Sequence, residues 1–319
     1  MRLPLRPPSW ARAPEWPASV PRPAPDRGVG VDYDPAWCRR YPVRLGRAIL
    51  LDNLTRPLAQ ILASPEVRGD EMLGLVDPPV IFAANHASHI DTPLLLSVLP
   101  VRFRHKTAVA AAADYFFDRR WKAHLWAFAL AAFPIERQRV NRRSADVAAE
   151  LVEDGWNLVI FPEGGRSPDG WQQEFRGGAA YLAARTGRPV VPVHMSETWR
   201  ILRKDGKLLG PSGKGLRRSP VTITFGNAIV PGPGEDSRLL ASRIERAVSV
   251  LADESRSDWW AARVHDAAGT TPPARGPDAS AWRRSWLLGP APPSRGKGLD
   301  GATSWVIRAK LRRSRKAPR

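Results

Sequence analysis

The chain has 319 residues, a formal net charge of +18 and a single cysteine, Cys38. This length allows one large α/β core, or two small cores with linkers. One cysteine excludes a disulfide framework and a thiolate zinc site, and it suits a reducing cytoplasm. The basic balance predicts an anionic partner, which could be nucleic acid, an acidic membrane surface or a phosphorylated substrate.

The excess charge is concentrated at the C-terminal end. Residues 281–319 carry eleven Lys and Arg against one acid, Asp300, which is +10 of the total of +18. No uninterrupted apolar run approaches the roughly 18–20 residues that span a bilayer. Residues 1–27 lack the apolar core of a signal peptide, because Pro and Arg interrupt them throughout. We therefore expect a protein that is soluble or bound to a membrane surface.

The N-terminal region divides into two parts. The first 36 residues contain nine prolines, so residues 1–38 are expected to be irregular or extended. From residue 39 to about 62, apolar residues recur at helical spacing with arginines between them, which predicts an amphipathic basic helix. One interpretation is a helix that packs on the core and exposes a solvated face. The other is a helix that docks on a membrane interface.

The body of the chain alternates between the two periodicities. Apolar runs predict strands at residues 80–84, 158–161, 190–193 and 221–225. Helical patterns occupy residues 93–99, 144–154, 178–185 and a segment that starts near Asp236 or Ser237 and places Leu240, Ile244, Val248 and Leu251 on one face. Residues 108–113 fit either state. This alternation predicts an α/β fold, a single domain over residues 39–252 with a largely parallel sheet flanked by helices.

The periodicity is lost at about Asp253. Pro, Gly, Ser, Arg and Trp dominate from there to the end of the chain. Residues 253–319 are therefore expected to be a basic tail that is disordered when alone.

A base and a carboxylate follow the run at residues 80–84. His86 and Asp91 are five positions apart, about 500° around an α-helix, so they would diverge inside one regular helix. They can meet if His86 lies in the turn before a helix and Asp91 in or near its first turn. A carboxylate bonded to one imidazole nitrogen raises the basicity of the other, so the pair predicts a general base. His89 suggests a metal site, but no third ligand is in range and we expect no metal.

A second polar segment follows the run at residues 158–161. It contains Glu163, Gly164, Gly165 and Arg166. Glycines at a strand end let backbone N–H groups approach an anion, and an arginine offers a planar bidentate donor for phosphate. Glu163 would either bond a substrate hydroxyl or brace the turn. Taken alone, the segment also fits an ordinary turn with a solvated arginine.

Together these segments resemble the glycerophospholipid acyltransferases of the PlsC type, known as 1-acyl-glycerol-3-phosphate acyltransferases. Four blocks match in order, and the resemblance covers about residues 67–252. The blocks are Asn85-His86-x4-Asp91, then Phe133-Pro134-Ile135-Glu136-Arg137, then Phe161 to Ser167 with Gly165 where Thr is usual, then Val190-Val191-Pro192-Val193. Residues 175–178, Phe-Arg-Gly-Gly, are similar to a further basic segment of the family.

The resemblance implies a transfer of an acyl group from acyl-CoA or acyl carrier protein to the hydroxyl of a lysophospholipid, with no other cofactor. It assigns the proton transfer to His86 and Asp91, and the binding of the phosphorylated acceptor to Arg137, Glu163, Gly164 and Arg166. The implied partners are the acyl thioester, the lipid acceptor and an anionic membrane surface. The implied location is cytoplasmic, at the inner face of the cell membrane.

Two other functions are compatible with parts of the sequence. A basic nucleic-acid-binding protein could act through the Arg/Trp tail, since aromatic rings stack on bases beside phosphate-binding cations. Its folded body would then carry a basic, aromatic-rich face, whereas here the surplus charge is mostly terminal. An inactive membrane adaptor with a transferase fold is the third reading, and intact His86 and Asp91 argue against it.

Overall fold

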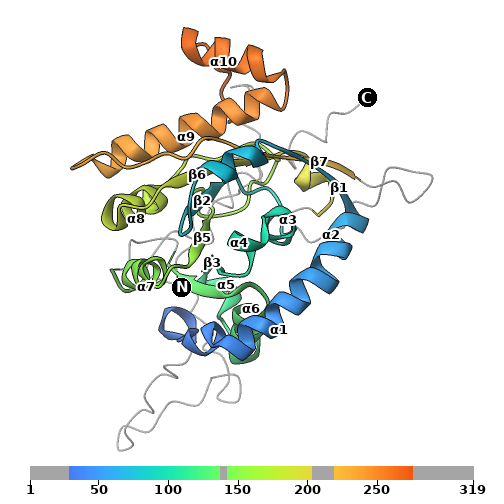
Figure 1. Ribbon diagram of the computed structural model, residues 1–319, viewed down its shortest axis with the longest axis vertical. Helices are drawn as coiled ribbons and strands as arrows, with labels where there is room; N and C mark the ends of the chain where they lie inside the picture. Colours follow the sequence, from blue (N-terminus) through green and yellow to red (C-terminus); the bar gives the residue numbers. More distant parts are fainter. Residues whose placement is uncertain (1–28, 137–141, 203–218, 276–319) are drawn as a thin grey trace, which may run out of the picture. The chain divides into compact units, whose positions relative to one another are not determined.

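A seven-stranded sheet in the order β1-β7-β6-β2-β5-β3-β4 runs through the protein (Figure 1). The computed structural model describes residues 29–136, 142–202 and 219–275. The strands are β1 (Ala63–Arg68), β2 (Ile81–Ala84), β3 (Thr107–Ala112), β4 (Ala132–Ile135), β5 (Asn157–Ile160), β6 (Val190–Met195) and β7 (Ser219–Phe225).

Five neighbouring strands, from β6 to β4, are parallel, as the alternating pattern predicted. β7 is antiparallel to β6, and β1 pairs parallel to β7, so these two strands run against the rest. β1 carries Pro65, which a sheet tolerates because β1 is an edge strand. Its polar composition explains why no apolar run indicated it.

Helices cover both faces of the sheet. Figure 1 shows α7, α8 and α9 on one side and α1, α2, α3 and α6 on the other. The helices are α1 (Tyr41–Leu50), α2 (Arg56–Leu62), α3 (Asp91–Val98), α4 (Val101–Arg104), α5 (Ala113–Phe116), α6 (Arg120–Leu130), α7 (Arg142–Glu153), α8 (Gly178–Thr186), α9 (Ser237–Glu254) and α10 (Trp259–Ala268). Two hydrophobic clusters form the core. The predicted α/β class is therefore confirmed.

The face predicted for α9 is confirmed residue by residue. Leu240, Ile244, Val248 and Leu251 are all buried. The side chain of Asp236 caps the helix by accepting a hydrogen bond from the backbone N–H of Arg238. Helical spacing identified this face because four apolar residues at i, i+4, i+8 and i+11 align on one side of a helix.

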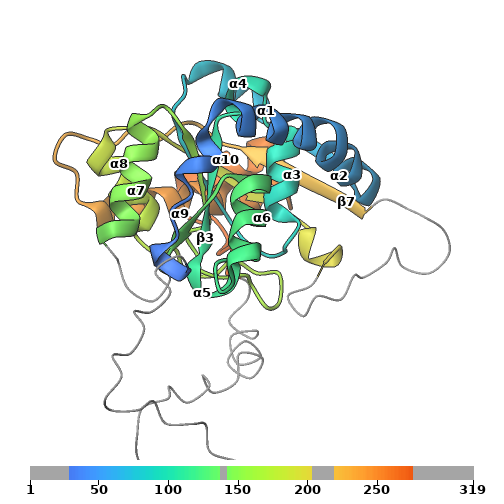
Figure 2. The same ribbon diagram turned by 90° about the horizontal axis from the view of Figure 1, so that it is seen from below.

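The N-terminal amphipathic helix exists, and its apolar residues divide between the core and the surface. Leu51 and Ala59 are buried in a core cluster, and Leu62 packs against that cluster. The run from α1 through a π-helical turn (Leu51–Thr55) to α2 exposes Leu54, Leu58 and Ile61 by 49–58%. Arg47 is buried instead, and its guanidinium donates to the carbonyls of Cys38 and Phe128. Figure 2 shows this run along the outside of α3 and α6. The core-packing interpretation is therefore wrong for Leu54, Leu58 and Ile61, whereas Leu62 packs against the core.

The expectation of an irregular tail from Asp253 onward is wrong for residues 253–268. α9 continues to Glu254, and α10 follows after a short turn. Asp258 caps α10 by accepting from the backbone N–H of Ala261, and Gly269 ends it in the left-handed region. α10 packs on α9. Its own apolar pattern is short, so helical spacing in the sequence did not predict it. The basic Trp-rich stretch lies outside the described residues, as do all of residues 276–319. Most of the Pro-rich N-terminal segment also lies outside them.

None of the helices in the described ranges is long and apolar enough to cross a bilayer.

Candidate active site

The pairing of β2 with β5 brings together two segments that are far apart in the sequence. The two strands are parallel, with Phe82 opposite Val159 and Ala83 opposite Ile160. The loops that contain His86 and Glu163 therefore leave the sheet at the same edge, where parallel sheets collect ligand-binding residues.

His86 and Asp91 meet as the offset predicted. His86 lies in the loop before α3, and Asp91 is the first residue of that helix. The distance from His86 Nδ1 to Asp91 Oδ2 is 2.8 Å. The Asp91 side chain is completely buried, whereas that of His86 is 18% exposed. With Nδ1 bonded to the carboxylate, Nε2 is the ring nitrogen left to exchange a proton.

Asp91 also fixes the backbone around the histidine. Its Oδ2 accepts hydrogen bonds from the N–H groups of Ala87 and Ser88, both at 2.8 Å. One oxygen therefore holds the imidazole and the turn that carries it. On the other side, the His86 ring stacks on Phe161 with 4.1 Å between ring centroids. The ring is thus oriented from two directions.

Glu163 holds the two loops together. It is 4% exposed; its Oε1 accepts from the backbone N–H of His86 at 2.9 Å, and its Oε2 accepts from that of Gln173 at 3.1 Å. The carbonyl of His86 in turn accepts from the N–H of Ser167 at 2.7 Å. These contacts match the bracing role that the sequence left open for Glu163.

The glycine next to it has a conformational role. Gly164 adopts φ +70°, and a Cβ there would lie 2.8 Å from Nε of Arg176. Its N–H donates to the carbonyl of Phe161 at 3.1 Å. The amide expected to face an anion is therefore engaged within its own turn, and Arg176 is the cation that lies against this turn.

Arg166 lies near two aromatic side chains, Tyr115 and His89, at the same end of the parallel strands. Its Cζ is 5.8 Å from the ring centroid of Tyr115, in α5, and that ring stacks on His89 with 6.0 Å between centroids. Burial, and then the positive charge of Arg166, lowers the pKa of His89 to about 4. His89 is therefore neutral near pH 7.

The remaining sequence blocks lie on two strands that are not adjacent, on either side of β2 and β5 in the sheet. Residues 132–135 form β4, and the fourth block begins β6. The side chain of Asn85 pairs with the backbone of Met195 through both its oxygen and its nitrogen, which ties the loop that contains His86 to the end of β6. Arg137 lies outside the described residues.

A family profile matches the part of the chain that contains this site. Residues 64–196 match the sequence profile of the Acyltransferase family. The match covers less than half of the 319-residue chain.

Two curated relatives and one solved structure illustrate the likeness. The chain is 32% identical over 182 residues to a 1-acyl-sn-glycerol-3-phosphate acyltransferase of Chlamydomonas reinhardtii, covering 55% of this chain and 49% of the relative. It is 30% identical over 190 residues to a lyso-ornithine lipid O-acyltransferase of Pseudomonas aeruginosa, covering 53% and 66%. The crystal structure of the 1-acyl-sn-glycerophosphate acyltransferase PlsC from Thermotoga maritima aligns with a TM-score of 0.49 at 22% identity, covering 69% of this chain and 85% of that one.

The likeness has a limited extent. The chain spans about half the length of the plant and algal 1-acyl-sn-glycerol-3-phosphate acyltransferases it matches. All the described site residues lie within the matched residues 64–196. Among the described residues, no group of three or more His, Cys, Asp and Glu side chains could hold a metal ion.

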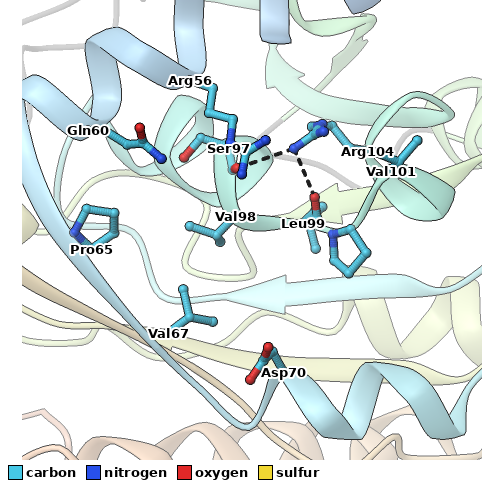
Figure 3. A pocket seen from close by; sticks show the side chains of 11 residues that line it. Arg56, Gln60, Pro65, Val67, Asp70, Ser97, Val98, Leu99, Val101 and Arg104 are labelled. Atoms are coloured by element: carbon cyan, nitrogen blue, oxygen red, sulfur yellow. Dashed lines mark hydrogen bonds between the residues drawn. The ribbon is translucent and has the colours of Figure 1, made fainter.

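A separate cavity of about 330 Å³ lies between α2, β1 and the C-terminal end of α3 (Figure 3). It is at the opposite end of α3 from Asp91. Arg104 lines it and donates to the carbonyls of Ser97 and Leu99, which end that helix, while Asp52 pairs with the same guanidinium at 2.9 Å. Asp52 balances the charge of Arg104, and the bonds to the two carbonyls cap the end of α3. The arginine in this cavity therefore has a structural role.

Proposed function

We propose that the protein transfers a fatty acyl group from acyl-CoA or acyl carrier protein to the free hydroxyl of a lysophospholipid, with 1-acylglycerol 3-phosphate as the acceptor and phosphatidate as the product. The contact that carries this proposal is the His86–Asp91 pair, 2.8 Å apart, at the edge where the sheet's parallel strands end. The match of residues 64–196 to the Acyltransferase family and the names of the relatives support the reaction class.

The chemistry needs one base and no covalent intermediate. Nε2 of His86 takes the proton of the acceptor hydroxyl while the hydroxyl oxygen attacks the thioester carbonyl. A C–O bond forms, the C–S bond breaks, and the proton passes to the departing thiolate. The buried Asp91 carboxylate stabilises the imidazolium that exists between these two proton transfers.

Arginines would bind the acceptor's phosphate. Arg166 comes after the end of β5, as Glu163 does. In the sequence, Arg137 is the second residue after the end of β4. A guanidinium can donate two parallel hydrogen bonds to a phosphate, which an ammonium cannot reproduce. Since one relative is named for a lyso-ornithine lipid, the acceptor panel must include a lysolipid without a phosphate.

The direct test uses full-length protein, labelled acyl-CoA and a panel of lysolipids. We expect labelled phosphatidate from lysophosphatidate, and a loss of about 10²–10⁴ in rate for His86→Ala. The chain offers a matched control in His265, which lies outside the matched residues 64–196. Its Nδ1 is 2.7 Å from Asp253 Oδ2, so this pair resembles His86 and Asp91. His265→Ala should keep its activity. If His86→Ala keeps more than a tenth of the wild-type rate, the proposed mechanism is wrong.

The N-terminal helical run would dock the enzyme on an anionic membrane surface, peripherally at the inner face. Its exposed apolar residues are Tyr41, Leu45, Ile49, Leu54, Leu58 and Ile61, each 49–72% exposed. The spacing from Ile49 to Leu54 is five residues, and the π-helical turn Leu51–Thr55 supplies the extra residue. This turn keeps the apolar stripe of α1 aligned with that of α2.

Two arginines of this run support the same orientation. Arg44 and Arg47 each place their Cζ 5.6 Å from the ring centroid of Trp156, so they face the body of the protein. Because these arginines face inward, the helix presents its apolar face to the outside. Such a face suits a lipid interface, where apolar side chains are buried at the boundary between headgroups and acyl chains.

Vesicle flotation tests the docking. Leu45→Glu with Ile49→Glu should reduce binding to anionic vesicles, whereas Leu239→Glu, at an equally exposed position on α9, should not. Turnover of a soluble short-chain acceptor should be unchanged in all of them. Equal flotation of the double variant and wild type would exclude this face as the docking site.

The same preparations test the nucleic-acid alternative. The Arg/Trp stretch 281–319 lies outside the described residues, so the distinction rests on binding data. Deleting it should lower binding to anionic vesicles, and high salt should weaken that binding because the charges act through screened solvent. A full-length protein that ignores vesicles and binds RNA or DNA tightly at physiological salt would favour the alternative.

A further inference from the structure

Tyr115 occupies a position next to the catalytic residues that the four sequence blocks do not include. It belongs to α5, which directly follows β3, and β3 pairs with β5. Its side chain is 49% exposed, so part of the ring is open to a bound molecule. The ring of Phe116, the next residue in α5, makes a T-shaped contact with it at 4.8 Å between ring centroids.

Two groups of the active site lie against the Tyr115 ring. The Cζ of Arg166 is 5.8 Å from the ring centroid, within the range of a cation–π interaction. His89, from the loop between His86 and Asp91, stacks on the ring at 6.0 Å with an interplanar angle of 27°. Three loops, which follow β2, β3 and β5, therefore meet at one aromatic ring.

The charges at this point favour a fixed arginine. His89 is neutral near pH 7 because burial and Arg166 lower its pKa to about 4, so it does not repel the guanidinium. The electron-rich face of the tyrosine ring attracts the guanidinium cation.

We propose that Tyr115 is a positioning residue for the phosphate of the acceptor: its ring, backed by His89, holds the Arg166 guanidinium beside His86. This inference rests on the proposed function, because it deepens the acceptor site. It makes Tyr115 a determinant of selectivity for phosphorylated over phosphate-free lysolipids. It also differs from a general apolar contact with an acyl chain, which would act equally on both kinds of acceptor.

Kinetics with two acceptors test the proposal. Tyr115→Leu removes the ring, and we expect the KM for lysophosphatidate to rise by about two- to thirty-fold, the range that cation–π interactions span. The KM for acyl-CoA and the turnover of 1-acylglycerol, which lacks the phosphate, should stay unchanged. Tyr115→Phe keeps the ring and should restore wild-type values. Tyr181→Leu, at a tyrosine of α8 that is 42% exposed, is the matched control.

A double-mutant cycle shows whether Tyr115 acts through Arg166. In an Arg166→Gln background, Tyr115→Leu should add nothing further, because the positioned cation is already gone. Additive effects, a change in the acyl-CoA KM, or an equal loss with both acceptors would overturn the proposal. So would a Tyr115→Phe variant as impaired as Tyr115→Leu.

A binding measurement separates this inference from the proposed reaction. Calorimetric titration with a soluble short-chain lysophosphatidate and its phosphate-free counterpart needs no turnover. If the wild type binds the phosphorylated lipid and Tyr115→Leu weakens only that binding, the positioning role stands even where no acyl transfer is detected. If the wild type acylates lysophosphatidate and the variant binds it normally, the positioning role is wrong and the reaction stands. A wild type that binds neither lipid overturns both.

Discussion

Asp91→Asn changes the charge of one buried side chain while keeping its shape. In the native protein Oδ2 accepts from His86 Nδ1, Ala87 N and Ser88 N, and Oδ1 is buried without a hydrogen-bond partner. The asparagine oxygen can still accept from the two backbone groups. Its NH₂ group then occupies the Oδ1 position, where no acceptor is present, at a cost of about 1–3 kcal/mol in the free energy of unfolding.

The expected kinetic loss is larger than this loss of stability. The hydrogen bond to His86 loses its charge assistance, which is worth about 1 kcal/mol. The imidazolium formed during proton transfer also loses an attraction of up to about 4 kcal/mol, for charges roughly 4 Å apart at an effective dielectric constant of 20. Each 1.36 kcal/mol is tenfold in rate, so about 3–5 kcal/mol lowers kcat by about 10²–10⁴.

Initial rates at saturating donor and acceptor measure this change, and chemical unfolding measures the stability. Both KM values should stay within about twofold of wild type, because the Asp91 side chain is inaccessible to a substrate. Asp253→Asn is the control: Asp253 also accepts from an imidazole Nδ1, at 2.7 Å, so its loss should cost stability without lowering kcat. A folded Asp91→Asn protein with kcat within tenfold of wild type would refute the reasoning.

Three further substitutions test the surrounding structure. Glu163→Gln should lower both thermal stability and kcat. Only one of the two amide positions can accept a hydrogen bond, so one N–H, such as that of His86, loses its partner. An unchanged kcat would exclude the bracing role. His194→Gln should flatten the acid dependence of unfolding. Burial lowers the pKa of His194 to about 3, so its contribution is fully present above pH ~6.5 and is lost as pH falls towards 3. Wild type should thus lose about 2 kcal/mol more than the variant between pH 7 and 5 in urea titrations, and equal slopes would contradict this. Gly170→Ala should reduce the thermal midpoint, since φ is +86° there and a Cβ would lie 2.6 Å from the Trp199 ring; an unchanged midpoint would show that the ring moves freely.

The local chemistry of the site followed from the sequence. An apolar run, a polar turn and the start of a helix place His86 and Asp91 together, because the geometry of a strand, a turn and a helix start is set within a few residues. The loop at Glu163 could be placed at the same edge, because the carboxyl ends of parallel strands coincide. The buried face of α9 was readable for a similar reason: periodicity is a local property.

What the tertiary structure alone decided is which surface each element meets. Helical spacing showed that the run over residues 41–62 has an apolar face, but the direction of that face depends on Trp156, about a hundred residues later, which receives the arginines. The place of Tyr115 beside Arg166 depends likewise on the order of β3 and β5 in the sheet. The sequence determined the residues and their local geometry. Long-range packing determined their neighbours, because contacts between distant segments leave no period or spacing in the chain.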